Sequence, residues 1–540
     1  MTTLKLNANN HQDIFRAASL LQAGELVAMP TETVYGLAAN AMDPAAVAKI
    51  FAAKGRPQDN PLIVHISNIK QACELAADFP ASAQKLAEAF WPGPLTMVLP
   101  RAGCVPDTVT AGLNSVALRM PAHPAALALL EACGLPLAAP SANRSGSPSP
   151  TTAQHVTDDL SGQIAAILDG GACEVGVEST VLSLAGDKPV ILRPGGVSPA
   201  QVEAVLGCEA LLCQAISEDE APASPGMKYR HYAPKAELTL VHGTLAAFIE
   251  HAKKAQPDGL LAFDHDMIPD GFTVLRYGST AGQQARLLYA KLREIDTLGC
   301  KKVLVRGPDK KGLGLAVHNR LLRAAEFREV GPVVGLTGPT GSGKSAAARM
   351  LAKMGCEVID GDAIAREIIW PGSEVLAQLA ARFGSDILNE DGSLNRARLA
   401  SRAFENNEAR KDLNAITHPA ITALALEQAG RAGGKIVIID AAALLESELA
   451  KHCSHIIITT APEQLRLERI LARDGIPEQA AGQRISAQAH MNFVPCDMEH
   501  TIIENTEGEA ELEQALKALL EEIRGAAADS GIGFGGHLCL

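Results

Sequence analysis

The clearest chemistry lies in a glycine-rich loop at residues 338–345, which reads Gly-Pro-Thr-Gly-Ser-Gly-Lys-Ser. It follows a strand-like segment at 333–337 and precedes a predicted helix at 346–354, the order that a phosphate-binding loop requires. Glycines let backbone N–H groups face a phosphate, and Lys344 reaches the outer phosphate oxygens. The hydroxyl of Ser345 suits Mg²⁺. A chance glycine-rich turn is the alternative, and its position between a strand and a helix argues against it.

Acidic residues end two further predicted strands near this loop. Asp360 closes the segment CEVID and is followed by Asp362, while Asp440 closes KIVIID. The carboxyl ends of parallel strands line one crevice of an open sheet, so these carboxylates are expected to converge on the phosphate loop. There a carboxylate can orient Mg²⁺ or accept a proton from an attacking hydroxyl. Each one alone also fits a helix N-cap, and that alternative stays open.

The N-terminal part carries a second set of polar groups at predicted strand ends. Residues 29–40, MPTETVYGLAAN, place hydroxyls and an acid after a strand, an arrangement that capping also explains. Further along, Lys54, Arg56, Asn60 and His65 join a predicted helix end to a strand. Two cations, an amide and an imidazole make an anion-binding edge. The alternative for this cluster is a solvated helix C-terminus.

Other polar clusters indicate that this edge belongs to a larger site. Ser115 and Arg119 are four residues apart on a predicted strand and therefore project from the same face. Segments 139–146, 176–180 and 193–196 add hydroxyl, amide and guanidinium groups at further strand ends. A core without a ligand has no need of so many polar strand ends, so the sequence predicts a pocket for an anionic ligand.

Short apolar strands alternate with amphipathic helices and must position these groups. A helix is predicted at 11–24 and another from Asp43, its cap, through Pro44 in its first turn to Gly55 at its end. Strands are predicted at 26–30, 61–66, 95–100, 115–121, 165–169, 179–184 and 189–194. The pattern is typical of an α/β domain.

The length of 540 residues implies several domains. Residues 216–236 change from acidic to proline- and glycine-rich and then to basic and aromatic, which predicts a linker that acts as a lid or, alternatively, a passive spacer. A second break falls at 329–332. We therefore expect a catalytic α/β domain at 1–215, a linker at 216–236, a small α/β domain at 237–328, a phosphate-loop domain at 331–523 and a disordered tail at 524–540.

Composition excludes several classes of protein. Hydrophobic residues make up 47% and charged residues 20%, values of a folded globular chain. The 48 lysine and arginine residues against 61 aspartate and glutamate residues give a net charge of −13, so no general basic field attracts DNA. The 11 cysteines include no C-x-x-C pair, which favours reduced thiols. Without a signal peptide or an apolar run of about 18 residues, a cytoplasmic protein with no membrane partner is expected.

Residues 11–328 resemble the longer, two-domain members of the threonylcarbamoyl-AMP synthase family. The motifs that carry this resemblance are, in order, PTETVYGL, KGRPQDNPLIVHI, WPGPLT, APSANRSG, ESTV, RPGG, SPGMKYRHYAP and GLGLAVHNRLLRAA. The family condenses L-threonine, bicarbonate and ATP into L-threonylcarbamoyl-AMP and pyrophosphate. Its product feeds the tRNA-modification machinery that acts on the adenosine beside the anticodon of certain tRNAs.

The resemblance implies a role for individual residues of this sequence. Threonine contacts are implied for Thr33, His65, Arg119, Ala139 and Ser179. ATP contacts are implied for Arg56, Asn60, Ser115, Ser141, Ser149, Arg193 and, from the linker, His231. Lys54 and Arg56 are the catalytic candidates, because two cations stabilise carbonate and triphosphate charge. No nucleophilic side chain is required, and catalysis by positioning is expected, with Mg²⁺ offsetting charge.

Residues 333–523 resemble dephospho-CoA kinase, a family that uses ATP to phosphorylate the ribose 3′-hydroxyl of dephospho-CoA. The motifs are LTGPTGSGKS, VIDGDAIAREI, DGSLNRARLASRAF, LNAITHPAI, IIDAAALLE and APEQLRLERILARD. ATP contacts are implied for Gly338, Gly341, Ser342, Gly343, Lys344, Ser345, Ala346, Arg473 and Arg484, the two arginines acting from a mobile lid. Lys344, Asp360 and Asp362 are the catalytic candidates, with Asp362 as the base.

Together these patterns predict an α/β multidomain fold. It comprises a twisted α/β synthase domain, a small α/β domain and a P-loop kinase with a parallel sheet, a helical insert and a lid. The predicted protein is a bifunctional enzyme that consumes ATP at two separate sites. Two alternatives stay open: a kinase half that acts on another small hydroxyl or nucleotide acceptor, and an N-terminal half that binds RNA without catalysis.

Overall fold

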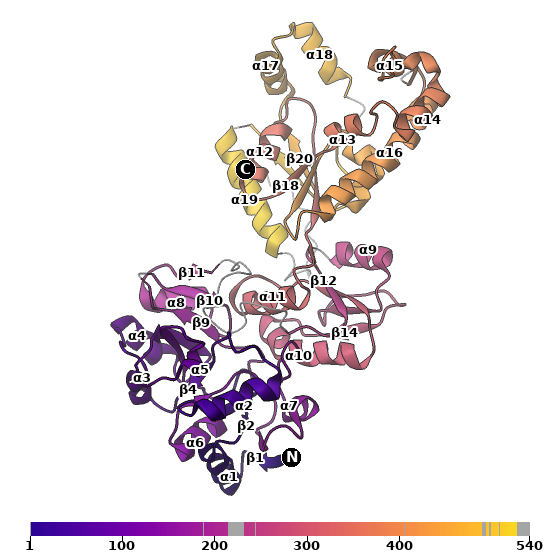
Figure 1. Ribbon diagram of the computed structural model, residues 1–540. Helices are drawn as coiled ribbons and strands as arrows, with labels where there is room; N and C mark the ends of the chain where they lie inside the picture. The colour runs from indigo at the N-terminus through magenta and orange to yellow at the C-terminus, as the bar shows by residue number, and fades with distance from the viewer. Residues whose placement is uncertain are drawn as a thin grey trace. The chain divides into compact units, whose positions relative to one another are not determined.

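The computed structural model (Figure 1) describes residues 2–186, 188–213, 232–243, 245–403, 405–488, 493–495, 498–506 and 508–525. The chain forms two compact units, unit one from Met1–Leu240 with Pro257–Arg328 and unit two from Val241–Gln256 with Glu329–Leu540. His231 and most of the predicted linker lie outside the described residues. So does the predicted tail from residue 526, while its first two residues belong to a helix that ends at Gly525.

Unit one is built on a mixed sheet of eleven strands in the order β1-β8-β2-β3-β7-β4-β6-β5-β9-β10-β11. Their bounds are β1 (Leu4–Asn7), β2 (Val27–Met29), β3 (Gly36–Asn40), β4 (Ile63–His65), β5 (Leu95–Pro100), β6 (Ser115–Arg119), β7 (Leu137–Ala138), β8 (Ala166–Asp169), β9 (Thr180–Ser183), β10 (Val190–Arg193) and β11 (Leu211–Leu212). The accompanying helices are α1 (His11–Gln22), α2 (Pro44–Lys54), α3 (Ile69–Leu75), α4 (Ala81–Phe90), α5 (Asp107–Thr110), α6 (Pro124–Cys133), α7 (Ala153–Leu160) and α8 (Pro199–Leu206).

Helix α2 follows the capping signals of its sequence. The Asp43 side chain accepts the N–H of Ala45, Pro44 occupies the first turn, and Gly55 ends the helix in the left-handed region at φ 62°. These residues confirm the predicted helix, and they fix Lys54 as its last residue. The helix end therefore delivers Lys54 and the following Arg56 to the edge of the sheet.

The segment 29–40 differs from the prediction of a single strand followed by polar groups. Its second half, Gly36–Asn40, is strand β3, which pairs antiparallel with β2. The run Gly-Leu-Ala-Ala has no alternation of apolar and polar residues because it is buried on both faces, so periodicity gave no signal. The polar residues 31–33 consequently lie in the turn between two core strands.

A second, smaller sheet of unit one contains strands in the order β14-β13-β15-β12, of which β14, β13 and β15 are parallel. They are β12 (Glu237–Val241), β13 (Gly259–Ala262), β14 (Val274–Arg276) and β15 (Lys302–Arg306), and the helices are α10 (Ala281–Thr297) and α11 (Gly312–Ala324). Helices α10 and α11 pack against each other. The apolar core of this sheet includes Leu288 and Leu292 of α10 together with Val177, which precedes β9 of the first sheet. The two sheets therefore share one hydrophobic cluster.

Unit two contains a parallel sheet of five strands in the order β18-β19-β17-β20-β21. The strands are β17 (Val333–Thr337), β18 (Glu357–Asp360), β19 (Val437–Asp440), β20 (His455–Thr460) and β21 (His500–Glu504), after the short β16 (Glu329–Val330). The helices are α9 (Leu245–Ala255), α12 (Lys344–Lys353), α13 (Gly361–Glu367), α14 (Glu374–Phe383), η1 (Ser385–Ile387), α15 (Arg396–Ala403), α16 (Asn407–Gly430), η2 (Leu444–Glu446), η3 (Glu448–His452), α17 (Glu463–Asp474), α18 (Glu478–Ser486) and α19 (Glu509–Gly525).

Helices cover both faces of this parallel sheet, as parallel strands require. Leu351 of α12 and Leu516 of α19 pack on one core, and Ile364 of α13 and Ala425 of α16 pack on the other. Figure 1 shows α14 and α15 at one end of this unit and α17 and α18 beside them, beyond the strand ends. The predicted insert at 391–404 corresponds to α15.

Among the described helices, none is long and apolar enough to cross a membrane.

Gly195 offers a test of the packing that fixes β9 beside the loop after β10. A Cβ added there would stand 2.2 Å from the N atom of Thr180 and 2.4 Å from the carbonyl oxygen of Glu178. We expect Gly195→Ala to lower the free energy of unfolding by about 2 kcal/mol, because the neighbours are backbone atoms that cannot move aside. Gly103→Ala, at a site with nothing within 4 Å among the described residues, is the matched control.

Urea denaturation followed by tryptophan fluorescence measures the effect in unit one alone. The chain has 2 tryptophans, buried Trp91 in unit one and exposed Trp370 in unit two. A Trp370→Phe background therefore leaves Trp91 as the reporter. Equal midpoints for the two glycine variants would contradict this account of the packing.

Candidate functional sites

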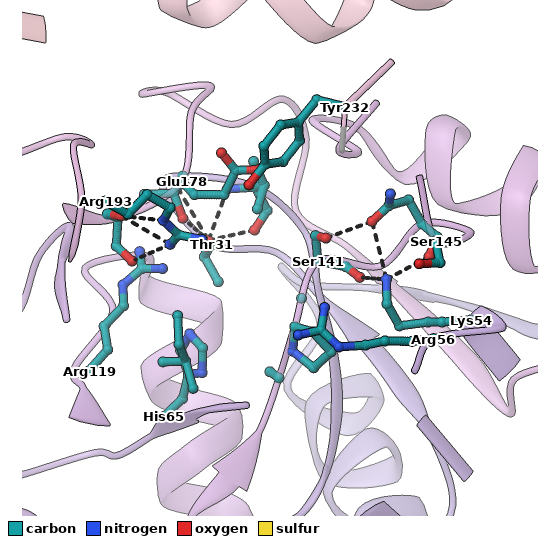
Figure 2. A pocket seen from close by; sticks show the side chains of 18 of the residues that line it. Thr31, Lys54, Arg56, His65, Arg119, Ser141, Ser145, Glu178, Arg193 and Tyr232 are labelled. Atoms are coloured by element: carbon teal, nitrogen blue, oxygen red, sulfur yellow. Dashed lines mark hydrogen bonds between the residues drawn. The ribbon is translucent and has the colours of Figure 1, made fainter. Parts of the chain in front are cut away.

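A pocket in unit one gathers polar side chains from the ends of several elements. Figure 2 shows Lys54 and Arg56 on one side of it and Arg119 and Arg193 on the other. Thr31 lies in the turn between β2 and β3, and other polar groups come from the ends of α2, β4, β6 and β10, from the loop after β7 and from the residues before β9. The pocket thus concentrates positive charge on a chain whose net charge is −13.

Lys54 is buried, and its ammonium group holds the loop that follows β7. Its Nζ donates to the carbonyl oxygens of Ser141 and Asn143, the latter at 2.6 Å, and to Asn143 Oδ1 at 3.2 Å. Burial and the neighbouring Arg56 lower the pKa of Lys54, whereas three accepting oxygens match the three N–H donors of the charged form. Lys54 therefore shapes the wall of the pocket through this loop.

Arg119 and His65 lie on neighbouring parallel strands, directly opposite each other in the register of β4 and β6. Arg119 Nη2 donates to Glu32 Oε1 at 2.6 Å, a buried ion pair. Burial and the positive charge of Arg119 lower the pKa of His65 to about 3. At neutral pH the imidazole is uncharged, so it can bind a ligand as a neutral hydrogen-bonding group beside a cation.

Arg56 and Arg193 supply further buried positive charge. Arg193 donates from Nη2 to the carbonyl oxygen of Ser179 at 3.0 Å. Burial, with Arg193 as a like-charged neighbour, lowers the pKa of Arg56 to about 10, so its guanidinium stays protonated at neutral pH. An anionic ligand would offset the mutual repulsion of these cations.

Several buried polar atoms around the pocket have no hydrogen-bond partner among the described residues. They are Glu32 Oε2, Arg56 Nε, His65 Nδ1 and both polar side-chain atoms of Asn60. An unpaired buried polar atom costs about 1–3 kcal/mol, and most such atoms in native proteins are paired. Their concentration here indicates a site whose partners arrive with water or a ligand.

The pocket brings together most of the predicted residues of this half. Its lining includes Thr33, Lys54, Arg56, His65, Arg119, Ala139, Ser141, Ser179 and Arg193. Asn60, Ser115 and Ser149 do not line it, and the hydroxyl of Ser149 donates to Glu178 at 2.6 Å. His231 lies outside the described residues. The threonine and ATP contacts assigned to all the residues of this half stay predictions.

Thr31, Glu178 and Tyr232 are among the lining residues that were not sequence candidates. Thr31 accepts the backbone N–H groups of Thr33 and Val34 and so fixes the turn, and Glu178 and Tyr232 close one side of the pocket. Thr31 belongs to the motif PTETVYGL and Glu178 to the motif ESTV. Their place in these motifs is the sequence feature from which both residues could have been proposed for the site. Tyr232 follows the undescribed part of the linker.

The second candidate site is the glycine-rich loop of unit two. It leaves β17, and α12 begins at Lys344, two residues earlier than predicted, because Gly343 adopts a φ of 103° directly before the helix. Contacts on the glycines exclude side chains: a Cβ on Gly338 would meet Thr459, and one on Gly343 would meet Asn505 at 2.1 Å. The backbone of this loop is therefore free to face a phosphate at the helix N-terminus.

Side chains from other elements hold the loop in shape. Asn505 Nδ2 donates to the carbonyl oxygen of Ser342 at 3.0 Å, and the Ser342 hydroxyl lies 2.8 Å from that of Thr459. Thr340 is held at both ends, because its N–H donates to Gln488 Oε1 at 2.7 Å and its carbonyl accepts Arg466 Nε at 2.8 Å. None of these partners was among the sequence candidates.

The acidic residues gather at the carboxyl ends of neighbouring strands, as predicted. Asp360 and Asp440 are direct partners in the register of β18 and β19, and Lys344 forms an ion pair with Asp440. Burial raises the pKa of Asp440; Lys344 opposes this rise, and the carboxylates of Asp360 and Asp362 add to it. Asp360 also caps α13 by accepting the N–H of Ala363, so the capping alternative holds for it as well.

The two arginines predicted to clamp phosphates, Arg473 and Arg484, lie together on helices α17 and α18. Arg473 Nε and Arg484 Nη1 both donate to Asp474, at 2.7 and 2.6 Å, on the paired helices α17 and α18. Ser345 and Ala346 lie in the first turn of α12 after Lys344. The phosphate contacts of Arg473 and Arg484 stay predictions.

Comparisons with known proteins match one family before residue 327 and another from residue 332. A family model described as "Telomere recombination" matches residues 19–195, one described as "Threonylcarbamoyl-AMP synthase, C-terminal domain" matches 197–326, and one described as "Dephospho-CoA kinase" matches 332–510. A threonylcarbamoyl-AMP synthase of Pyrococcus abyssi is 49% identical over 326 residues, which cover 58% of this chain and 94% of that protein.

Two further matches extend this result. A dephospho-CoA kinase of Syntrophotalea carbinolica is 42% identical over 159 residues, covering 29% of this chain and 75% of that protein. A crystal structure of P. abyssi Sua5 complexed with L-threonine aligns with a TM-score of 0.58 at 44% identity, over 61% of this chain and 99% of that structure.

The neutral state of His65 predicts how stability depends on pH. An unfolded histidine titrates near pH 6.5, whereas folding lowers the pKa of His65 to about 3, so the unfolded state binds more protons between these values. As pH falls below 6.5, this residue alone should reduce the free energy of unfolding by about 1.4 kcal/mol per pH unit. The measurement is urea denaturation of the Trp370→Phe chain at pH 6.5, 5.5 and 4.5.

His65→Gln should flatten this pH dependence, while His11→Gln, at an exposed position, is the matched control and should leave it unchanged. Parallel curves for the parent chain and His65→Gln would show that the folded protein protonates this imidazole readily.

Proposed function

The chain belongs to the threonylcarbamoyl-AMP synthase family in its N-terminal part and to the dephospho-CoA kinase family in its C-terminal part, and we propose how its two sites perform these reactions. The protein is a bifunctional enzyme, and ATP is a substrate of both halves. The observation that carries the synthase assignment in this molecule is the pocket of buried cations with unpaired polar atoms around it.

In the synthase pocket the cations bind the anionic parts of the substrates. Arg119 is the partner for the carboxylate of L-threonine, and His65 and Ser179 lie beside it. A similar protein has been crystallised with L-threonine, which supports this substrate. Arg56 and Arg193 bind the phosphates of ATP, since fixed guanidinium groups suit bidentate contacts with phosphate oxygens.

The reaction proceeds by positioning. The threonine nitrogen and bicarbonate form a carbamate with loss of water, and a carbamate oxygen attacks the α-phosphorus of ATP. The bond from the α-phosphorus to the bridging oxygen breaks, and pyrophosphate leaves with its electron pair. Lys54 keeps the 141–143 backbone in place during these steps, while the nearby cations stabilise the developing phosphate charge.

In the kinase half the glycine-rich loop cradles the phosphates of ATP and Lys344 contacts the outer ones. The 3′-hydroxyl of dephospho-CoA attacks the γ-phosphorus, and Asp362 accepts its proton, with Asp360 beside it. ADP is the leaving group. Lys344 forms an ion pair with Asp440, and its contact with the outer phosphates draws the ammonium group away from this carboxylate.

The donors at this site fit Mg²⁺. The exposed hydroxyl of Ser345 and the carboxylates of Asp360, Asp362 and Asp440 are hard oxygen donors, and Asp360 and Asp440 are direct partners in the register of β18 and β19. Bound there, Mg²⁺ would neutralise phosphate charge. Without a cation this cluster of negative charge would repel the nucleotide.

We further propose the domain bounds 1–215, 216–236, 237–328, 331–523 and 524–540 for the working enzyme, in the cytoplasm. Threonylcarbamoyl-AMP passes from the synthase to tRNA-modification machinery, and neither DNA nor a membrane is a partner. Threonylcarbamoyl-AMP and coenzyme A are used in different reactions, and each half of the chain binds its own ATP molecule.

Removing one cation from each site in turn tests the assignment of the two activities. Lys344→Ala should lower ATP-dependent phosphorylation of dephospho-CoA by about 100-fold or more, because a phosphate contact is lost from the transition state, and leave pyrophosphate release unchanged. Arg119→Met should do the reverse, lowering pyrophosphate release with threonine, bicarbonate and ATP by a similar factor. Each variant is the control for the other.

The measurements are pyrophosphate release and the conversion of dephospho-CoA on the full chain. Absence of threonine-dependent pyrophosphate release from the parent chain would rule out the synthase assignment. Turnover of ATP with another hydroxyl or nucleotide acceptor, and none with dephospho-CoA in a panel of acceptors, would replace the kinase substrate.

A further inference from the structure

A buried carboxylate forms part of the synthase pocket and is held by residues that lie outside it. Glu178 precedes Ser179, and both line the pocket. Its oxygens accept hydrogen bonds from Tyr289 of α10, at 2.9 and 2.8 Å, and from Arg320 Nε of α11, at 2.7 Å. Ser149 adds a third donor. Two helices of the smaller sheet thus reach across to fix one residue of the pocket.

Arg320 also fixes a second residue of the pocket. Its guanidinium carbon lies 5.4 Å from the ring centre of Tyr232, whose ring is 5.6 Å from that of Tyr289. Tyr232 has a φ of 66°, a strained conformation for a side chain other than glycine, and the next N–H, of Ala233, donates to the carbonyl oxygen of Gly146. A stacked cation and ring contacts stabilise this conformation.

Charge explains why an arginine is needed at this place. The pocket binds anions, and an uncompensated Glu178 beside it would repel triphosphate and attract the guanidinium of Arg193. Burial alone would raise the pKa of Glu178, but Arg320 and then Arg193 outweigh burial and hold it at about 2, so the group is a carboxylate at neutral pH. Arg320 is fully buried and carries the balancing charge.

We propose that Arg320 is a positioning residue for the synthase reaction, which sets the affinity for ATP from outside the pocket by neutralising Glu178 and holding Tyr232. This rests on the proposed synthase function. Arg193, whose Nε and Nη2 point to the carbonyl oxygen of Ser179, then keeps its position at the pocket instead of turning to Glu178. The smaller sheet is thereby part of the catalytic apparatus.

The test compares Arg320→Met with a matched control in the same part of the fold. Arg306 is also buried, pairs with Asp266 at 3.3 Å and lies 5.4 Å from the ring centre of Phe263, two partners that do not line the pocket. Removing either arginine leaves an unpaired buried carboxylate and destabilises the fold. Only Arg320→Met should raise the KM for ATP, by about tenfold or more, with a smaller change in kcat.

A second variant separates charge from packing. Arg320→Met combined with Glu178→Gln removes both charges but still lacks the contact with Tyr232, so the KM for ATP should fall about threefold or more below that of Arg320→Met without reaching the parent value. Pyrophosphate release is measured in the Lys344→Ala background, and thermal unfolding confirms that each variant is folded. If Arg320→Met does not fold, Arg320→Lys, which keeps the charge but loses the planar group over Tyr232, should raise the KM for ATP by less than about tenfold.

An equal rise in KM for Arg306→Met would overturn the proposal, because the effect would then follow from lost stability. Failure of the double variant to recover, or a tenfold rise for Arg320→Lys, would also overturn it. If the parent chain shows no threonine-dependent turnover, the proposed function fails instead. Calorimetric titration of ATP into the same variants then still decides the role of Arg320.

Discussion

Burial of positive charge before any substrate arrives is the constraint on which both halves of this protein depend. A desolvated cation is costly, and each one here is held by oxygens that the fold has placed in advance. Lys54 is held by the loop after β7, Arg119 by Glu32 and Lys344 by Asp440. The sheets provide these oxygens at strand ends, where the backbone turns and its carbonyl groups become available.

The same constraint explains how an acidic protein binds acidic substrates. The net charge of −13 is spread over the whole chain, whereas the cations of the synthase pocket are buried in one place. In a low-dielectric pocket a fixed charge acts strongly on a bound group and weakly at a distance, because salt screens exposed charges within about 10 Å. Local geometry thus decides what binds, and the general charge keeps the surface hydrated.

Much of this arrangement was predictable because it depends on residues close together in sequence. Helix α2 followed from Asp43, Pro44 and Gly55, and the phosphate loop followed from its glycines and its place between a strand and a helix. In each case local rules and the fold agree.

What escaped prediction depends on contacts between distant residues. Glu178 meets Tyr289 and Arg320 across 111 and 142 residues, and no spacing rule links them. The family resemblance implies an ATP contact for Ser149, yet its hydroxyl donates to that same carboxylate. Strand β3 was missed for a different reason, because burial on both faces removes the alternation by which a strand is recognised.

The hold on Thr340 gives the kinase half a property of its own. Arg466 belongs to α17 and Gln488 follows α18, so both hydrogen bonds to this loop residue come from the segment that carries Arg473 and Arg484. That segment therefore supports the glycine-rich loop through direct hydrogen bonds. A displacement of α17 and α18 pulls on the glycine-rich loop directly, and a substitution remote from the phosphates alters the shape of the cradle without touching the nucleotide.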